Sequence, residues 1–81
     1  MKSIATELVN EYKRLKLIIV SRYDYSGFRV NAIDMSNIKV KAKQHALTIN
    51  LILDCDEEMI DERLRYFLNE ELNILKRGNL I

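Results

Sequence analysis

The 81-residue sequence contains no proline, no tryptophan and only two glycines, and it has one cysteine and one histidine. Stretches rich in proline and glycine mark linkers and disordered segments, so their absence predicts a chain that is ordered nearly from end to end. Cys55 has no second cysteine with which to form a disulfide inside the chain. One cysteine and one histidine also cannot complete a zinc shell, so we expect no metal and no other cofactor.

Long apolar runs are missing as well. No stretch approaches the ~18 consecutive apolar residues of a membrane span, and the first residues show no apolar signal-peptide core. A single free cysteine is typical of a reducing compartment. We therefore expect a cytoplasmic protein that does not contact membranes.

The length predicts one domain covering residues 1–81. A core of this size offsets the entropy of the chain with little to spare, and without disulfides or metals a second subunit is the remaining source of stability. Charge is uneven, because residues 1–45 hold nine Lys and Arg against four Asp and Glu, whereas residues 46–81 hold four against eight. A basic half and an acidic half can complement each other inside one fold, steer partners or pair head to tail between subunits.

The last quarter of the sequence, from Asp54 to Gly78, is predicted to form one long amphipathic helix. Asp54 is a suitable N-cap, and Glu57 completes an Asp-x-x-Glu capping box. At the other end Lys76 and Arg77 suit the negative pole of the helix, and Gly78 can adopt the left-handed conformation that ends it. The apolar side of this helix consists of Ile60, Leu64, Phe67, Leu68, Leu72, Ile74 and Leu75.

Such a helix would be about 34 Å long, which matches the whole diameter of a domain of this size. Its ends would then need surface from a second molecule. Glu71 interrupts the apolar side. It either lies near the rim or pairs with a lysine of the same chain, or it meets a cation on a partner. A second line on the opposite flank is either a solvated face or a contact surface. It consists of Met59, Arg63, Tyr66 and Glu70.

Upstream, the spacing of apolar residues predicts a first helix over residues 4–16. The run Leu17–Val20 fits either its last turn or a buried strand, and the β-branched residues favour a strand. Ser26-Gly27 marks a turn, so residues 17–24 and 28–34 are expected to pair as a hairpin.

Residues 38–53 are the most strand-like segment of the sequence. Ile38, Val40 and Ala42 alternate with lysines, whereas farther along the apolar residues occupy odd positions. Because side chains of a strand alternate with period two, this change of parity predicts a turn or a bulge near Gln44-His45. The odd-numbered apolar residues are Leu47, Ile49, Leu51 and Leu53.

Together these elements predict an α+β fold, in which a helix, a four-stranded antiparallel sheet and the long helix follow one another. The alternative is a mostly α protein in which residues 36–47 form a helix capped by Ser36. In that alternative Ile38, Ala42 and His45 share one face, but Val40 and the alternating lysines fit it poorly.

Two surface patterns are candidates for binding. On a strand, Lys39, Lys41 and Lys43 would form a stripe with a spacing of about 7 Å. That stripe either contacts nucleic-acid phosphates or is a solvated face that resists aggregation. The aromatic and arginine side chains around the expected hairpin have three alternative interpretations. They stack on nucleic-acid bases, anchor a protein interface or form ordinary cross-strand pairs. This second pattern consists of Arg22, Tyr23, Tyr25, Phe28 and Arg29.

No pattern in the sequence indicates a catalytic site. His45, next to the expected turn, is predicted to be exposed and inert. Cys55 lies within the acidic stretch from Asp54 to Glu58, whose charges disfavour a thiolate and are explained by helix capping. No nucleophile, base and orienting group come together.

The sequence therefore predicts a small non-enzymatic protein-interaction module, a regulator or inhibitor that acts as a homodimer. The expected partner-binding residues are Met59, Arg63, Tyr66, Glu70, Glu71, Tyr23, Tyr25 and Phe28. The alternative is a nucleic-acid-binding protein. Its expected contacts are Lys39, Lys41, Lys43, Arg22 and Arg29.

Overall fold

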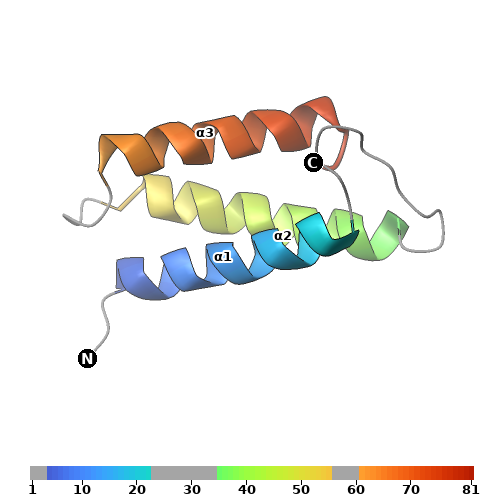
Figure 1. Ribbon diagram of the computed structural model, residues 1–81, viewed down its shortest axis with the longest axis horizontal. Helices are drawn as coiled ribbons and strands as arrows, with labels where there is room; N and C mark the ends of the chain where they lie inside the picture. The colour runs from blue at the N-terminus through green and yellow to red at the C-terminus, as the bar shows by residue number, and fades with distance from the viewer. Residues whose placement is uncertain (1–3, 23–34, 56–60) are drawn as a thin grey trace.

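The computed structural model describes residues 4–22, 35–55 and 61–81, and each of these stretches contains one helix. Helix α1 covers Ile4–Arg22, α2 covers Met35–Leu53 and α3 covers Glu62–Arg77. The helices lie side by side and alternate in direction, with α2 between α1 and α3 (Figure 1). The described residues contain no strand, so the prediction of a four-stranded sheet is wrong and the mostly α alternative fits.

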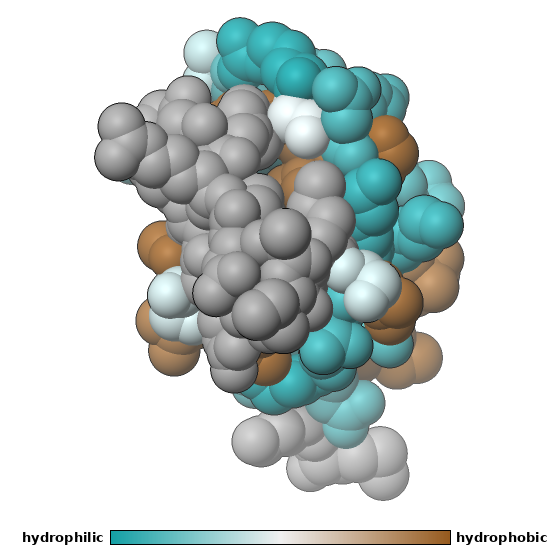
Figure 2. All heavy atoms as spheres, turned by 90° about the vertical axis from the view of Figure 1, so that its right-hand side faces the viewer, coloured by the Kyte–Doolittle hydropathy of each residue, from teal (hydrophilic) through white to brown (hydrophobic). Residues whose placement is uncertain are grey.

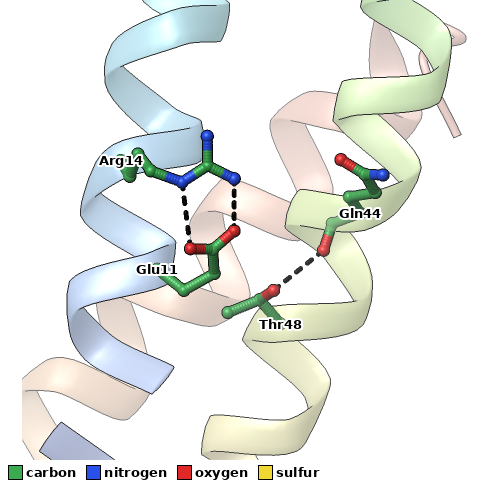
Figure 3. A network of polar contacts seen from close by, with 4 residues as sticks. All are labelled: Glu11, Arg14, Gln44 and Thr48. Atoms are coloured by element: carbon green, nitrogen blue, oxygen red, sulfur yellow. Dashed lines mark hydrogen bonds and ion pairs between the residues drawn. The ribbon is translucent and has the colours of Figure 1, made fainter. Parts of the chain in front are cut away.

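Helix α1 continues past residue 16, where the sequence left helix and strand open. Tyr12, Leu15 and Ile19 are buried at intervals of three and four residues, which is the spacing of one continuous helix. The predicted hairpin is therefore wrong for residues 17–22, and the rest of it lies outside the described residues. On the surface of α1, the guanidinium of Arg14 donates to the carboxylate of Glu11 one turn earlier (Figure 3).

Helix α2 occupies the segment that was expected to form strands. Its buried residues recur every three or four positions, which is the period of a helix. They include Ile38, Ala42, His45, Ile49 and Ile52. The change of parity from Ala42 to Ile49 is thus a helical feature, because even and odd positions share the buried face of a helix. Gln44 and His45 lie inside the helix instead of in a turn, and the Thr48 hydroxyl donates to the Gln44 carbonyl oxygen at 3.0 Å (Figure 3).

Helix α3 begins later than expected, at Glu62. Its N-cap is Asp61, whose Oδ1 accepts a hydrogen bond of 2.8 Å from the backbone N–H of Leu64. Asp54 is therefore not the N-cap; it follows the end of α2, where its N–H donates to the Asn50 carbonyl. At 16 residues, α3 spans about 24 Å. This is well short of the 40 Å long axis of the molecule, so the argument that the helix outreaches its own chain is wrong.

The C-terminal end of α3 is closed by backbone hydrogen bonds. Asn79, and not Gly78, takes the left-handed conformation, with φ of 58° against −84° for the glycine. The N–H of Asn79 donates to the carbonyl of Lys76 at 3.1 Å, and the N–H of Leu80 donates to that of Leu75 at 3.0 Å. These two bonds form a Schellman motif, and Leu80 completes it by joining the apolar core.

One apolar core joins the three helices. Its members are Ala5, Tyr12, Ile19, Ile38, Ala42, Ala46, Ile49, Ile52, Leu68, Leu72, Leu75 and Leu80. A polar contact also fixes α3 to the end of α2, because the guanidinium of Arg65 donates to the carbonyl oxygens of Leu53 and Cys55. The last carbonyls of a helix have no partner within the helix, so Arg65 satisfies groups that would otherwise need water.

Candidate functional site

Four polar side chains from the three helices meet between the helices; three of them are buried and Lys16 reaches the surface. The ring of His45 on α2 is fully buried and stacks on the ring of Tyr12 on α1, with centroids 5.1 Å apart and planes within 10°. Glu71 of α3 points one carboxylate oxygen at His45 Nε2, at 3.6 Å, and the other at Lys16 Nζ of α1, at 2.8 Å. The Lys16 ammonium also donates to the Tyr12 hydroxyl at 3.5 Å. We call Tyr12, Lys16, His45 and Glu71 the polar cluster.

The charges of the polar cluster stabilise one another. Burial alone would raise the pKa of the Glu71 carboxyl, but His45 and the Lys16 ammonium outweigh burial and hold that pKa below its usual value. Burial also opposes the charge of Lys16, yet the pairing with Glu71 raises the pKa of the ammonium. For Tyr12, burial and the negative charge of Glu71 both raise the pKa of the phenol. At neutral pH the cluster therefore contains a Lys16–Glu71 ion pair beside a neutral phenol.

Access to His45 is closed. Its side chain has no exposed surface, and within the described part of the chain neither ring nitrogen has a hydrogen-bond partner. A general base must come within hydrogen-bond reach of the proton that it removes. The geometry thus gives His45 a structural position between α1 and α3, and the prediction that it is exposed is wrong.

The outer side of α2 carries a second set of apolar side chains. Val40, Leu47 and Leu51 are 54%, 61% and 45% exposed, although each is large and hydrophobic. Together with exposed Gln44 they recur at intervals of four, three and four residues, opposite the buried side of the same helix. We call Val40, Gln44, Leu47 and Leu51 the α2 stripe. The strand prediction obscured this stripe, because alternation divides its members between two faces, and helical spacing is the signal that reveals it.

The predicted partner-binding residues of α3 lie at different depths. Tyr66 and Arg63 are exposed and Glu70 is partly buried. Phe67, which was expected in the core, is 56% exposed, and its ring meets that of Tyr66 edge-on with centroids 6.1 Å apart. Glu71 belongs to the polar cluster and faces a lysine of its own chain, which is the first of the two alternatives for this residue.

Helix α1 carries a smaller apolar patch on its outer side. Leu17 and Val20 are exposed, and with Lys13 and Lys16 they line a surface hollow of about 210 Å³. Seen from one end of the molecule, hydrophobic side chains reach the surface on both broad sides of the layer of helices (Figure 2). Apolar surface is therefore not confined to a single helix.

The predicted lysine stripe is not assembled. On a helix, Lys39 and Lys43 lie one turn apart on one side, whereas Lys41 is turned away from them by about 160° and lies near Glu11 of α1. The strand geometry that would match these lysines to phosphates is absent from this segment. Arg22 is the last residue of α1, and its side chain is not described. The predicted residues outside the described ranges are Tyr23, Tyr25, Phe28, Arg29 and Met59.

Neither metal ligands nor membrane spans emerge from the described ranges. Within residues 4–22, 35–55 and 61–81, no three His, Cys, Asp or Glu side chains are grouped so that they could hold a metal ion. None of the three helices is both long and apolar enough to cross a membrane. No family model matches the chain, and no curated protein or solved structure is significantly similar to it. The surfaces described above are therefore the basis for a function.

Proposed function

We propose that this protein is a small helical interaction module that works by binding protein, without catalysis, and that its working form is a homodimer. A regulator or inhibitor in the cytoplasm fits this description. The observation that carries the proposal is the α2 stripe, in which three large apolar side chains are exposed on a helix whose opposite side fills the core. Apolar side chains grouped on one surface mark interaction sites, whereas scattered ones do not.

The size of the stripe sets the expected strength of the dimer. Removing the exposed half of one such side chain from water is worth about 1 kcal/mol. Val40, Leu47 and Leu51 of two copies then contribute on the order of 6 kcal/mol, against an association cost of about 4 kcal/mol or more. The stripe alone would leave a net of about 2 kcal/mol, so a dimer that forms in the near-millimolar range must also bury neighbouring surface of α1 or α3 worth about 2 kcal/mol more.

Sedimentation equilibrium across protein concentrations from micromolar to near-millimolar tests the proposal. The chain mass is 9.6 kDa, and we expect the weight-average mass to rise toward twice that value. Because the interface is mainly apolar, the rise should persist in high salt, where exposed charges are screened. A mass that stays at 9.6 kDa throughout would contradict a homodimer, and with it the reason for assigning an interaction function to the stripe.

A further inference from the structure

We infer that α2 pairs with α2 of a second copy in antiparallel orientation, across a two-fold axis that passes between His45 and Ala46. This inference rests on the proposed homodimer and specifies its surface and geometry. The α2 stripe has the alternating four- and three-residue spacing of a two-helix seam, in which side chains of one helix fit between those of the other. Its four members cover three turns of α2.

The stripe is complementary to itself when the two helices run in opposite directions about this axis. A two-fold interface places the same surface patch on both copies, with each residue of one copy meeting its counterpart reciprocally. About the axis between residues 45 and 46, Val40 lies opposite Leu51 of the second copy, and Gln44 lies opposite Leu47. Apolar side chains thus meet at both ends of the seam, and the two Gln44 amides lie close to the axis, where each can reach the other or water.

Charge selects the antiparallel orientation. Exposed Lys39 and Lys43 lie toward the N-terminal end of α2, and the helix itself contains no acidic residue, whereas exposed Asp54 follows its C-terminus. An antiparallel partner brings the lysine-bearing end of one copy to the Asp54 end of the other. A parallel partner would place lysines beside lysines and align the two helix dipoles unfavourably.

The rim of the seam is polar, as in known interfaces. Figure 3 shows the Glu11–Arg14 pair of α1 beside Gln44 and Thr48 of α2. A second copy that crosses the centre of the stripe would meet this pair at the edge of the contact. The seam is therefore bordered on the α1 side by charges that remain hydrated.

The first experiment compares the dimer dissociation constants of Leu47→Glu and Leu17→Glu with that of the wild type. Both leucines are exposed on the outer side of a helix, at 61% and 71%, but only Leu47 belongs to the stripe. A carboxylate in the seam is expected to raise the dissociation constant at least roughly tenfold, whereas Leu17→Glu should leave it unchanged. If the wild type is a dimer and Leu47→Glu does not weaken it, the α2 pairing is wrong but the proposed homodimer is still supported. If the wild type is a monomer, both the α2 pairing and the proposed homodimer are wrong. Circular dichroism checks that each variant is folded.

The second experiment measures orientation without altering the seam, so it remains decisive even where Leu47→Glu fails to fold. A spin label is attached to Ser36→Cys in a Cys55→Ser background, because Ser36 is exposed near the start of α2. In the antiparallel pair the two labels are separated by 19 residue steps along the helix, which is on the order of 30 Å. A parallel pair would bring them to about 10–15 Å, close to the interaxial distance. Dipolar spectroscopy measures the distance between the two labels. The short distance would refute the proposed pairing, and so would an absence of coupling between labels at concentrations where the chain is dimeric.

Discussion

At the residue scale, Glu71 connects all three helices. It extends from α3, pairs with Lys16 of α1 and faces the ring of His45 on α2. Replacing it with Gln removes the charge that Lys16 faces while keeping the shape of the side chain. We expect Glu71→Gln to lower the free energy of unfolding by about 1–2 kcal/mol. This loss is small for a buried ion pair, because the Lys16 ammonium still reaches water. Urea unfolding followed by circular dichroism at neutral pH measures the change.

The neighbouring residue supplies the control for that measurement. Glu70 has the same charge and lies on the same helix, but it is outside the polar cluster. Glu70→Gln should change the free energy of unfolding by less than about 0.5 kcal/mol. Equal losses from the two variants would mean that the ion pair with Lys16 does not stabilise the fold.

The same pair makes stability depend on pH. Since the pKa of Glu71 lies below its usual 4.5 in the folded protein, its contribution is complete above that value and is lost as pH falls through the lowered pKa. The pKa values of Tyr12 and Lys16 lie above their usual 10.0 and 10.5, so the folded state holds both protons more tightly than the unfolded chain. Stability from these two groups is therefore present below pH 10 and declines above it.

Unfolding curves collected from acid to alkaline pH test this dependence. The difference in unfolding free energy between wild type and Glu71→Gln should be largest near neutrality and should shrink below pH 4.5. The wild type should also lose stability above pH 10. A difference that stays constant into the acid range would show that protonation of Glu71 does not underlie it.

At the element scale, α2 shows what the sequence determines and what it does not. Ile38 and Val40 alternate with lysines, as apolar and polar residues do in a strand. This alternation over five or six residues favoured the strand prediction, although the apolar residues of the longer segment recur at helical spacing. Only when the periodicity is followed from Ile38 to Ile52 do the buried positions fit one helix face. Ala42 and Ala46, which are good helix formers and poor strand formers, support that choice. The existence of α1 and α3 was predictable from the sequence. The N-terminal boundary of α3 was not, because it depends on which of several acidic residues is the N-cap, and this residue is Asp61.

The end of α3 yields a prediction that separates two adjacent residues. Asn79 has φ of 58° and Gly78 has φ of −84°. A side chain with a β-carbon is disfavoured in the left-handed region, where Asn is tolerated better than most. Asn79→Ala should therefore cost about 1 kcal/mol, and Asn79→Gly should be neutral or stabilising. Gly78→Ala should be tolerated, because its backbone is right-handed. Thermal unfolding of the three variants checks the assignment, and a Gly78→Ala variant less stable than Asn79→Ala would contradict it.

At the scale of the whole molecule, the candidate interaction surface could be predicted only after the fold. Tyr66 and Arg63 were identified as exposed from their position opposite the apolar side of α3, which needs only the helix period. The α2 stripe required knowing which side of α2 stays uncovered when α1 and α3 pack against it, which is a tertiary fact. The burial of His45 is tertiary for the same reason, since it depends on Tyr12 and Glu71 closing over it from two other helices.

The attachment of α3 to the rest of the molecule is the last testable feature. The backbone of α3 approaches α2 but not α1, and side chains hold it in place, among them the core residues Leu68, Leu72 and Leu75. Arg65 does so by donating to the carbonyls of Leu53 and Cys55 at the end of α2. Arg65→Met keeps the apolar stem but removes both bonds, and hydrogen bonds from a charged donor are worth about 1.5–3 kcal/mol. We expect a loss of that size, with faster amide hydrogen exchange in the first turns of α3. Arg63→Met, an exposed arginine two residues away, is the matched control. If both variants lost the same stability and exchanged alike, the Arg65 contacts would not be what holds α3 against α2.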